Sequence, residues 1–128
     1  MTTDAATATQ LLQALVGHSL PQLGVGVGDL QMNFGGGLHV NLAGSVRVGT
    51  GEFAEPYSLG ALAFLLPLLN NEVTQAQAGD DGSLSLTFGA TSLRCDADAH
   101  YEAWNYNGPS RSLVVSMPGG GFAIWSSR

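Results

Sequence analysis

Lysine is absent from this sequence, and arginine is rare. The ten aspartates and glutamates outnumber the four arginines and give a formal net charge of −6 at pH 7. Such a chain cannot carry a dense row of positive charge, which excludes binding by phosphate neutralisation, so we expect no nucleic-acid partner. The same acidic balance favours a basic protein partner, since complementary charge speeds encounter and disfavours wrong pairs. The arginines are Arg47, Arg94, Arg111 and Arg128.

Charge of either sign is also scarce. Charged residues make up 11% of the chain, against about 25% in an average protein. Apolar and neutral polar groups must therefore cover much of the surface, which favours an interface with another molecule. We expect a protein partner, with a structural homo-oligomer as an alternative.

Cysteine occurs once, as Cys95. A single thiol excludes an intrachain disulfide and a cysteine-based zinc site, and it fits a reducing compartment. The N-terminal "MTTDAATATQ" has neither a basic residue nor an apolar run, so it is not typical of a secretory signal or a lipid anchor. The most apolar segment, "LGALAFLLPLL", has about half the length that a bilayer requires and contains Pro67. We therefore expect a cytoplasmic protein without a membrane partner.

Two segments have helical patterns. In residues 1–19, apolar side chains recur at helical spacing and predict one amphipathic N-terminal helix. A second, short helix is predicted at about residues 58–69, where nearly every side chain is apolar. A helix that is apolar on all sides is typical of a buried position. The recurring residues of the first helix are Ala5, Ala8, Leu12 and Leu15.

The remaining sequence alternates between apolar and polar residues in short runs separated by glycine-rich turns. This period predicts antiparallel strands joined as hairpins, with a meander in the C-terminal half. Together with the two helices, it predicts an α+β fold with an antiparallel, strongly bent sheet or open barrel of about 7–8 strands. We expect residues 1–128 to form a single domain whose β-rich body covers residues 20–128. The clearest runs are residues 30–34, 38–42, 84–88 and 113–117.

The segment "CDADAHYEAW", residues 95–104, combines the cysteine with carboxylates, a histidine and a tryptophan. In a straight strand the polar side chains would share one face, and a His-x-Glu pair can reach one metal ion. Asp-Ala-Asp-Ala is a poor strand former, however, so a loop followed by a strand is the better interpretation. No second motif completes a coordination shell, and we expect neither a metal nor another cofactor. The polar residues concerned are Asp96, Asp98, His100 and Glu102.

Catalytic signatures are missing as well. In an extended chain His100 would lie about 16 Å from Cys95, too far to act as its base, so a buried structural thiol is the favoured interpretation. The serines lack a G-x-S-x-G elbow, and "GVGVGD" lacks the spacing of a dinucleotide-binding loop. We therefore expect that the protein is not an enzyme.

The leading hypothesis is a non-enzymatic protein-binding domain, such as an immunity-type or accessory protein of a toxin system. Aromatic side chains at the edge of a core can anchor a partner, and acidic ones attract a basic partner. An alternative is a small-ligand-binding protein with a pocket enclosed by the bent sheet. The candidate partner-binding residues are Tyr101, Glu102, Trp104, Asp80, Asp81 and Trp125. The candidate pocket residues are Met32, Phe34, Phe88 and Trp104.

Several short motifs follow one another in a distinctive order. They are D-G-x-L-x-L from Asp81, Y-E-A-W at residues 101–104, a G-P turn at Gly108, and P-G-G-x-x-A-x-W at residues 118–125. In this order they resemble a family of small, mostly actinobacterial proteins of unknown function, over residues from about 20 to 125. The chain departs from that pattern in its N-terminal helix and in "DADAH". The resemblance bears on fold and domain extent and brings no catalytic residues with it.

Overall fold

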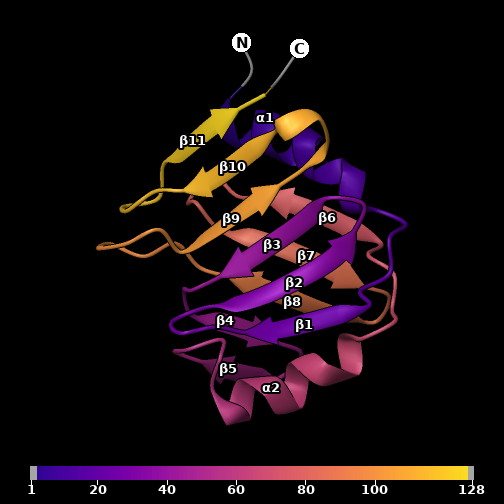
Figure 1. Ribbon diagram of the computed structural model, residues 1–128. Coiled ribbons are helices and arrows are strands. Elements are labelled where there is room, and N and C mark those ends of the chain that lie inside the picture. The colour runs from indigo at the N-terminus through magenta and orange to yellow at the C-terminus, as the bar shows by residue number, and fades with distance from the viewer. Residues whose placement is uncertain (1–2, 127–128) are drawn as a thin grey trace.

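The computed structural model describes residues 3–126 as two antiparallel sheets that face each other, with a helix at either end (Figure 1). The strand order is β1-β2-β3-β9-β10-β11 in the six-stranded sheet and β5-β4-β8-β7-β6 in the five-stranded sheet. The six-stranded sheet comprises β1 (Gln22–Val25), β2 (Leu30–Gly35), β3 (Leu38–Leu42), β9 (Trp104–Asn107), β10 (Leu113–Ser116) and β11 (Phe122–Trp125). The five-stranded sheet comprises β4 (Val46–Val48), β5 (Gly51–Phe53), β6 (Gln75–Ala78), β7 (Leu84–Phe88) and β8 (Thr91–Cys95).

The predicted α+β class, with two helices and antiparallel strands, is confirmed. Two differences concern the strands. They divide between two sheets that do not close into a barrel, and residues 3–126 contain eleven of them, more than expected. The additional strands include β1 and β5, which are short, contain glycine and look like turns in the sequence.

The predicted hairpins pair as their alternation indicates. Strands β2 and β3 pair around the turn at Gly36 and Gly37, and both glycines adopt the positive φ that a tight turn needs. Strands β6 and β7 form the second predicted hairpin, around the turn "GDDG", and β8 pairs with the other side of β7. Beyond β3 the chain crosses to the other sheet, where β4 pairs with β8.

The N-terminal helix α1 (Asp4–Leu12) continues as a short 3-10 helix, η1 (Gln13–Leu15). Its predicted apolar stripe is buried in the core. The helix also covers the free edge of β6, where Gln13 Nε2 donates to the Ala76 carbonyl at 2.7 Å and the Ala78 amide donates to Thr9 Oγ1 at 2.9 Å. The edge strand is thus protected from pairing with another chain.

The second helix, α2 (Leu59–Leu65), is followed by the 3-10 helix η2 (Leu66–Leu68), which includes Pro67. The expectation that this helix is buried on all sides is wrong. Its inward face carries Ala61, Leu65 and Leu68, but Leu59 has 87% of its surface exposed. The helix lies across one end of the two sheets, beside β5 (Figure 1), and solvent covers its other side. No helix among residues 3–126 has the length and apolar character to span a membrane.

One hydrophobic core lies between the sheets. Leu30, Met32 and Val40 enter it from the six-stranded sheet, and Leu84 and Leu86 enter it from the five-stranded sheet. The alternation that predicted these strands therefore points their apolar side chains inward and leaves their polar side chains outside.

Candidate functional site

Two arginines lie directly opposite each other on the outer face of the five-stranded sheet. Arg47 occupies the middle of β4 and Arg94 occupies β8, and their Cα atoms are partners in the strand register. Their apolar neighbours Val46, Val48 and Leu93 point into the core, so the pleat directs both guanidinium groups outward. Like charges in this position repel each other, so the pair requires compensating carboxylates.

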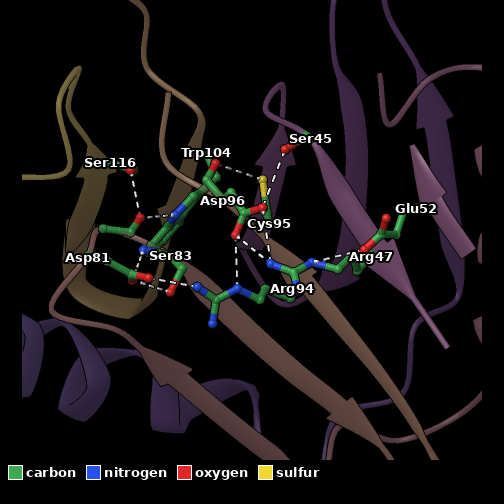
Figure 2. Close-up of polar contacts among 11 residues, drawn as sticks. Ser45, Arg47, Glu52, Asp81, Ser83, Arg94, Cys95, Asp96, Trp104 and Ser116 are labelled. Atoms are coloured by element: carbon green, nitrogen blue, oxygen red, sulfur yellow. Dashed lines mark hydrogen bonds and ion pairs between the residues drawn. The ribbon is translucent and has the colours of Figure 1, made fainter. Parts of the chain in front are cut away.

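Three carboxylates supply that compensation. Arg94 donates from Nε to Asp96 Oδ1 at 2.9 Å and from an Nη atom to Asp81 Oδ2 at 2.7 Å. Arg47 lies farther from its partners, at 3.5 Å from Asp96 and 4.0 Å from Glu52. Asp96 thus sits between the two arginines (Figure 2). The Arg94 contacts are tight hydrogen bonds, whereas those of Arg47 are loose and half exposed to solvent.

Asp81 is held by its own turn as well as by Arg94. The Ser83 hydroxyl donates to Asp81 Oδ1 at 2.6 Å, and the Ser83 amide donates to the same oxygen at 3.1 Å. These two hydrogen bonds, followed by the contact with Arg94, lower the pKa of the Asp81 carboxyl below its usual value. The turn before β7 is therefore tied to the charged face of β8.

A hollow of ≈ 440 Å³ opens beside Arg47. Its wall carries positive charge only from Arg47, and negative charge from Glu52 and Asp96. The remaining lining is neutral: Ser45, Val46, Phe53 and Ala54.

A group of acids and tyrosines continues from this hollow. The Tyr57 hydroxyl donates to Glu55 Oε2 at 2.7 Å, and this hydrogen bond is the main reason that the pKa of Tyr57 is raised. Burial first, and then the negative charges of Asp98 and Glu55, raise the pKa of Tyr101. The segment before α2 and the loop after β8 therefore meet here. We call the combined surface the acidic face, composed of Glu52, Glu55, Tyr57, Asp96, Asp98 and Tyr101.

The cysteine beneath this face is closed to solvent. Cys95 is fully buried, and its thiol lies 3.6 Å from the Ala103 carbonyl. Burial raises the pKa of Cys95 to about 12, so the thiol stays protonated and unreactive at neutral pH. The predicted buried structural thiol is confirmed. The acidic face combines carboxylates and tyrosines without an accessible thiol, so its chemistry suits the binding of a cation.

The D-G, Y-E-A-W and P-G-G motifs of the sequence lie close together at a separate site, on the buried side of the turn between β6 and β7. The Trp104 indole Nε1 donates to the Gly82 carbonyl at 2.9 Å, and Ser116 Oγ donates to the same oxygen at 2.8 Å (Figure 2). Gly82 also lies against Gly120, so closely that a Cβ on Gly82 would be 2.6 Å from the Gly120 Cα. The D-G, Y-E-A-W and P-G-G motifs therefore meet through Gly82, Trp104 and Gly120 and join the two sheets.

The predicted partner-binding residues do not form one site. Tyr101 and Glu102 are exposed in the loop before β9, and Tyr101 belongs to the acidic face. Trp125 is exposed on β11, the outermost strand of the other sheet. The expectation of a surface position for Trp104 is wrong, because its side chain is only 1% exposed. The acidic turn residues Asp80 and Asp81 are both exposed, and Asp81 joins the arginine network.

The residues of the alternative ligand pocket are packed into the core. Met32, Phe34, Phe88 and Trp104 are each at most 5% exposed. They do not line the hollow beside Arg47.

Residues 96–103 form a loop and not a strand, as predicted, and the Asp98 side chain accepts a hydrogen bond from the His100 amide at 2.8 Å. Among residues 3–126, no group of three or more histidines, cysteines, aspartates and glutamates is placed to hold a metal ion.

Sequence reasoning missed Arg47, Glu52, Glu55 and Tyr57 as members of a site. The segment "GEFAEPYS" did carry a signal, since it places two glutamates and a tyrosine directly before a helix. What the sequence could not indicate is the pairing of β4 with β5 and β8, which brings this segment beside Asp96 and Tyr101.

Comparison with known proteins reveals one family. No curated protein and no solved structure matches the chain significantly. Residues 11–126 match the model of a family of unknown function (DUF6188), a match that begins inside α1, before the start of the resemblance found in the sequence. Because the match covers most of the chain, this protein belongs to the DUF6188 family of unknown function.

Proposed function

We propose that this chain is a non-enzymatic, cytoplasmic protein-binding domain whose acidic face receives a basic segment of a partner protein. The observation that carries the proposal is the convergence of carboxylates from separate parts of the chain around two tyrosines. Glu55 precedes α2, whereas Asp98 lies more than forty residues later in the loop after β8. Both carboxylates are nevertheless close enough to Tyr101 to raise its pKa.

The negative charges of the acidic face are only partly neutralised by arginines of this chain. Asp96 and Glu52 have arginine partners, whereas Glu55 and Asp98 have none within ion-pair distance among residues 3–126. A guanidinium or ammonium group from outside supplies the missing charge. Tyr57 and Tyr101 add aromatic faces on which a cationic side chain can lie.

An immunity-type or accessory role in a toxin system is one form of this proposal. A toxin that acts on nucleic acid carries the positive charge that phosphate binding demands. An acidic inhibitor complements such a surface, speeds the encounter and blocks access to the nucleic acid. The net charge of −6 fits that role.

The first test is a titration of the ¹⁵N-labelled protein with a synthetic arginine-rich peptide, followed by amide chemical shifts. We expect the largest shift changes at residues 52–57 and 96–102, with an affinity that falls as salt is added. Changes spread evenly over the surface, or centred on β11, would count against the acidic face.

A paired set of variants sharpens the test. Glu55→Gln combined with Asp98→Asn removes two charges while keeping an oxygen for the Tyr57 hydroxyl and for the His100 amide. Asp29→Asn combined with Glu72→Gln removes the same charge at other exposed or half-exposed positions. We expect the first pair to weaken peptide binding about tenfold or more and the second pair to change it little.

A further inference from the structure

The outer face of the six-stranded sheet carries a continuous group of neutral amide side chains. Partners in an antiparallel register point to the same side of a sheet, so the register gives the rows of side chains on this face. Two unbroken rows cross all six strands, and neither contains an aspartate, glutamate, lysine or arginine. The first row is Gln22, Asn33, His39, Asn107, Leu113 and Trp125, and the second is Gly24, Gln31, Asn41, Asn105, Val115 and Ala123.

The polar part of these rows lies on β1, β2, β3 and β9. Figure 1 shows this face toward the viewer, and no helix among residues 3–126 crosses it. Four neighbouring strands span about 14 Å. We call this surface the amide platform, composed of Gln22, Gln31, Asn33, His39, Asn41, Asn105 and Asn107.

The asparagines of the amide platform are not explained by the fold. Asparagine is depleted in strands, because its side chain competes for backbone hydrogen bonds. Threonine at these partly exposed positions would favour the strands instead. Positions where a sequence departs from the preference of its own secondary structure are typical of functional surfaces. The four asparagines are Asn33 in β2, Asn41 in β3, and Asn105 and Asn107 in β9.

The amides orient one another and still keep unused hydrogen-bonding groups. Asn41 Nδ2 donates to Asn105 Oδ1 at 3.1 Å, and Asn33 Nδ2 donates to Gln22 Oε1 at 3.2 Å. Within residues 3–126, no partner is bonded to Asn41 Oδ1, Asn33 Oδ1 or Asn105 Nδ2. No buried side-chain nitrogen or oxygen of these residues lacks a partner, so the unused groups reach the surface. They form an ordered array of donors and acceptors.

An exposed aromatic ring extends the first row beyond the amides. Trp125 on β11 is 56% exposed, and its register partner Leu113 is in turn the partner of Asn107. Trp125 therefore lies two strand spacings, or about 10 Å, from Asn107. Its indole offers a flat apolar surface on the same side of the sheet as the amides.

A neutral chain of sugars has the chemistry that this face requires. Each carboxamide both donates and accepts hydrogen bonds, and so does each sugar hydroxyl. The C–H face of a sugar ring is apolar and can stack on an indole. The 14 Å length of the platform suits a short oligosaccharide better than a single sugar.

Other classes of ligand match the face less well. A charged ligand gains no ion pair from either row, and a nucleic acid finds none of the cations that its phosphates need. A protein surface that covered the array would have to supply a polar partner for every amide that it buries. An oligosaccharide supplies several hydroxyls from each ring and meets this demand.

We propose that the amide platform binds a neutral oligosaccharide, with hydroxyls paired to the amides of β2, β3 and β9 and one ring stacked on Trp125. The oligosaccharide lies across the strands, along the two rows. This inference does not depend on the proposed function, because none of the platform residues belongs to the acidic face.

The first experiment titrates the ¹⁵N-labelled protein with four neutral linear oligosaccharides: maltoheptaose, cellohexaose, xylohexaose and chitohexaose. We expect at least one of them to shift the side-chain amide signals of Asn41 and Asn105 and the indole signal of Trp125 in a saturable manner. The backbone signals of residues 52–57 should stay in place. Since no ion pair is involved, added salt should leave the affinity unchanged, unlike the affinity of a basic peptide for the acidic face.

A pair of double variants tests the role of the amides. Asn41→Thr combined with Asn105→Thr removes two amides, and the protein should stay folded because threonine favours strands. We expect this variant to bind the oligosaccharide about tenfold more weakly. The control, Gln75→Thr combined with Gln77→Thr, removes two amides from exposed positions of β6 in the other sheet and should bind as the wild type does.

Three results would overturn the proposal. One is the absence of saturable binding for all four oligosaccharides. The second is binding that the Asn41→Thr and Asn105→Thr variant retains in full, or that shifts the signals of residues 52–57 in place of those of the platform. The third is a shift of the platform signals with protein concentration and not with oligosaccharide, which would assign the face to contact between copies of this chain.

Discussion

Trp104 and Gly82 connect the two sheets through a single hydrogen bond. The indole nitrogen of Trp104, in β9 of the six-stranded sheet, donates to the Gly82 carbonyl, in the turn before β7 of the five-stranded sheet, at 2.9 Å. The ring itself is buried and packs edge-on against Phe122, with 5.8 Å between centroids. The tryptophan of the Y-E-A-W motif therefore joins the two layers, with only 1% of its surface exposed.

Replacing Trp104 with phenylalanine tests this role. The variant loses the indole N–H and part of the buried ring, and we expect it to lower the free energy of unfolding by about 2–4 kcal/mol. Urea denaturation measures the change. Trp125→Phe is the control: because Trp125 is 56% exposed, its substitution is expected to cost less than about 0.5 kcal/mol. Equal losses in the two variants would contradict the assignment.

Gly82 is expected to tolerate no side chain. Its φ is +87°, and a Cβ would lie 2.6 Å from the Gly120 Cα and 2.7 Å from the Gly120 carbonyl oxygen. Gly82→Ala therefore combines backbone strain with a backbone clash, and we expect a loss of about 3 kcal/mol or more. Gly89 provides the control, since its φ is +68° but the space around it is open. Gly89→Ala should cost only about 1–2 kcal/mol in the same denaturation assay.

The Asp81 carboxylate predicts a dependence of stability on acid pH. Its pKa in the folded protein is lowered below the unfolded value of 3.8, chiefly by the hydrogen bonds from Ser83. The stabilisation is therefore complete above pH 3.8 and is lost as pH falls through the lower, folded pKa. The difference in unfolding free energy between wild type and Asp81→Asn should shrink over this range. At neutral pH it should stay below about 1 kcal/mol, because the carboxylate is largely exposed. A difference that is constant from neutral pH to pH 2 would contradict this explanation.

The raised pKa of the buried Cys95 thiol predicts that stability falls as the pH becomes alkaline. Burial raises its pKa from 9.0 to about 12, so above pH 9 the thiol ionises in the unfolded chain while it stays protonated in the folded one. Stability should therefore fall as pH rises from 9 toward 12, and fall less in Cys95→Ala. At neutral pH a thiol reagent should modify Cys95 in the native protein only as fast as the folded structure opens and exposes the thiol. In the urea-unfolded protein the same reagent should modify Cys95 at once. Fast labelling of the native protein would show that the thiol is accessible.

Local features of the fold could be predicted from the sequence. Alternation in residues 30–42 and 84–88 identified β2, β3 and β7, because one face of each strand is buried. Strands β1 and β5 were not predicted, because "QLGV" and "GEF" are short, contain glycine and show no clear alternation of apolar and polar residues. The division into two sheets depends on distant pairings, such as β3 with β9, that local patterns do not encode.

Side-chain positions were harder to predict than strands. Trp104 and Tyr106 alternate with Asn105 and Asn107, and this alternation in β9 does indicate that both aromatic rings point inward. The apolar composition of α2 suggested burial, yet the helix lies at the end of the sheets, where the core covers only one of its sides. The acidic face could not be predicted, because it joins residues 52–57 to residues 96–101 through tertiary structure alone.

The most direct test of the proposed function is the capture of partners from the source cells by chemical cross-linking, with the wild-type protein compared with the Glu55→Gln and Asp98→Asn double variant. The acidic face predicts that the wild type retains a basic protein, that added salt weakens the capture, and that the double variant loses it. Recovery of the same basic protein in equal amount by both forms would contradict the assignment of binding to this face.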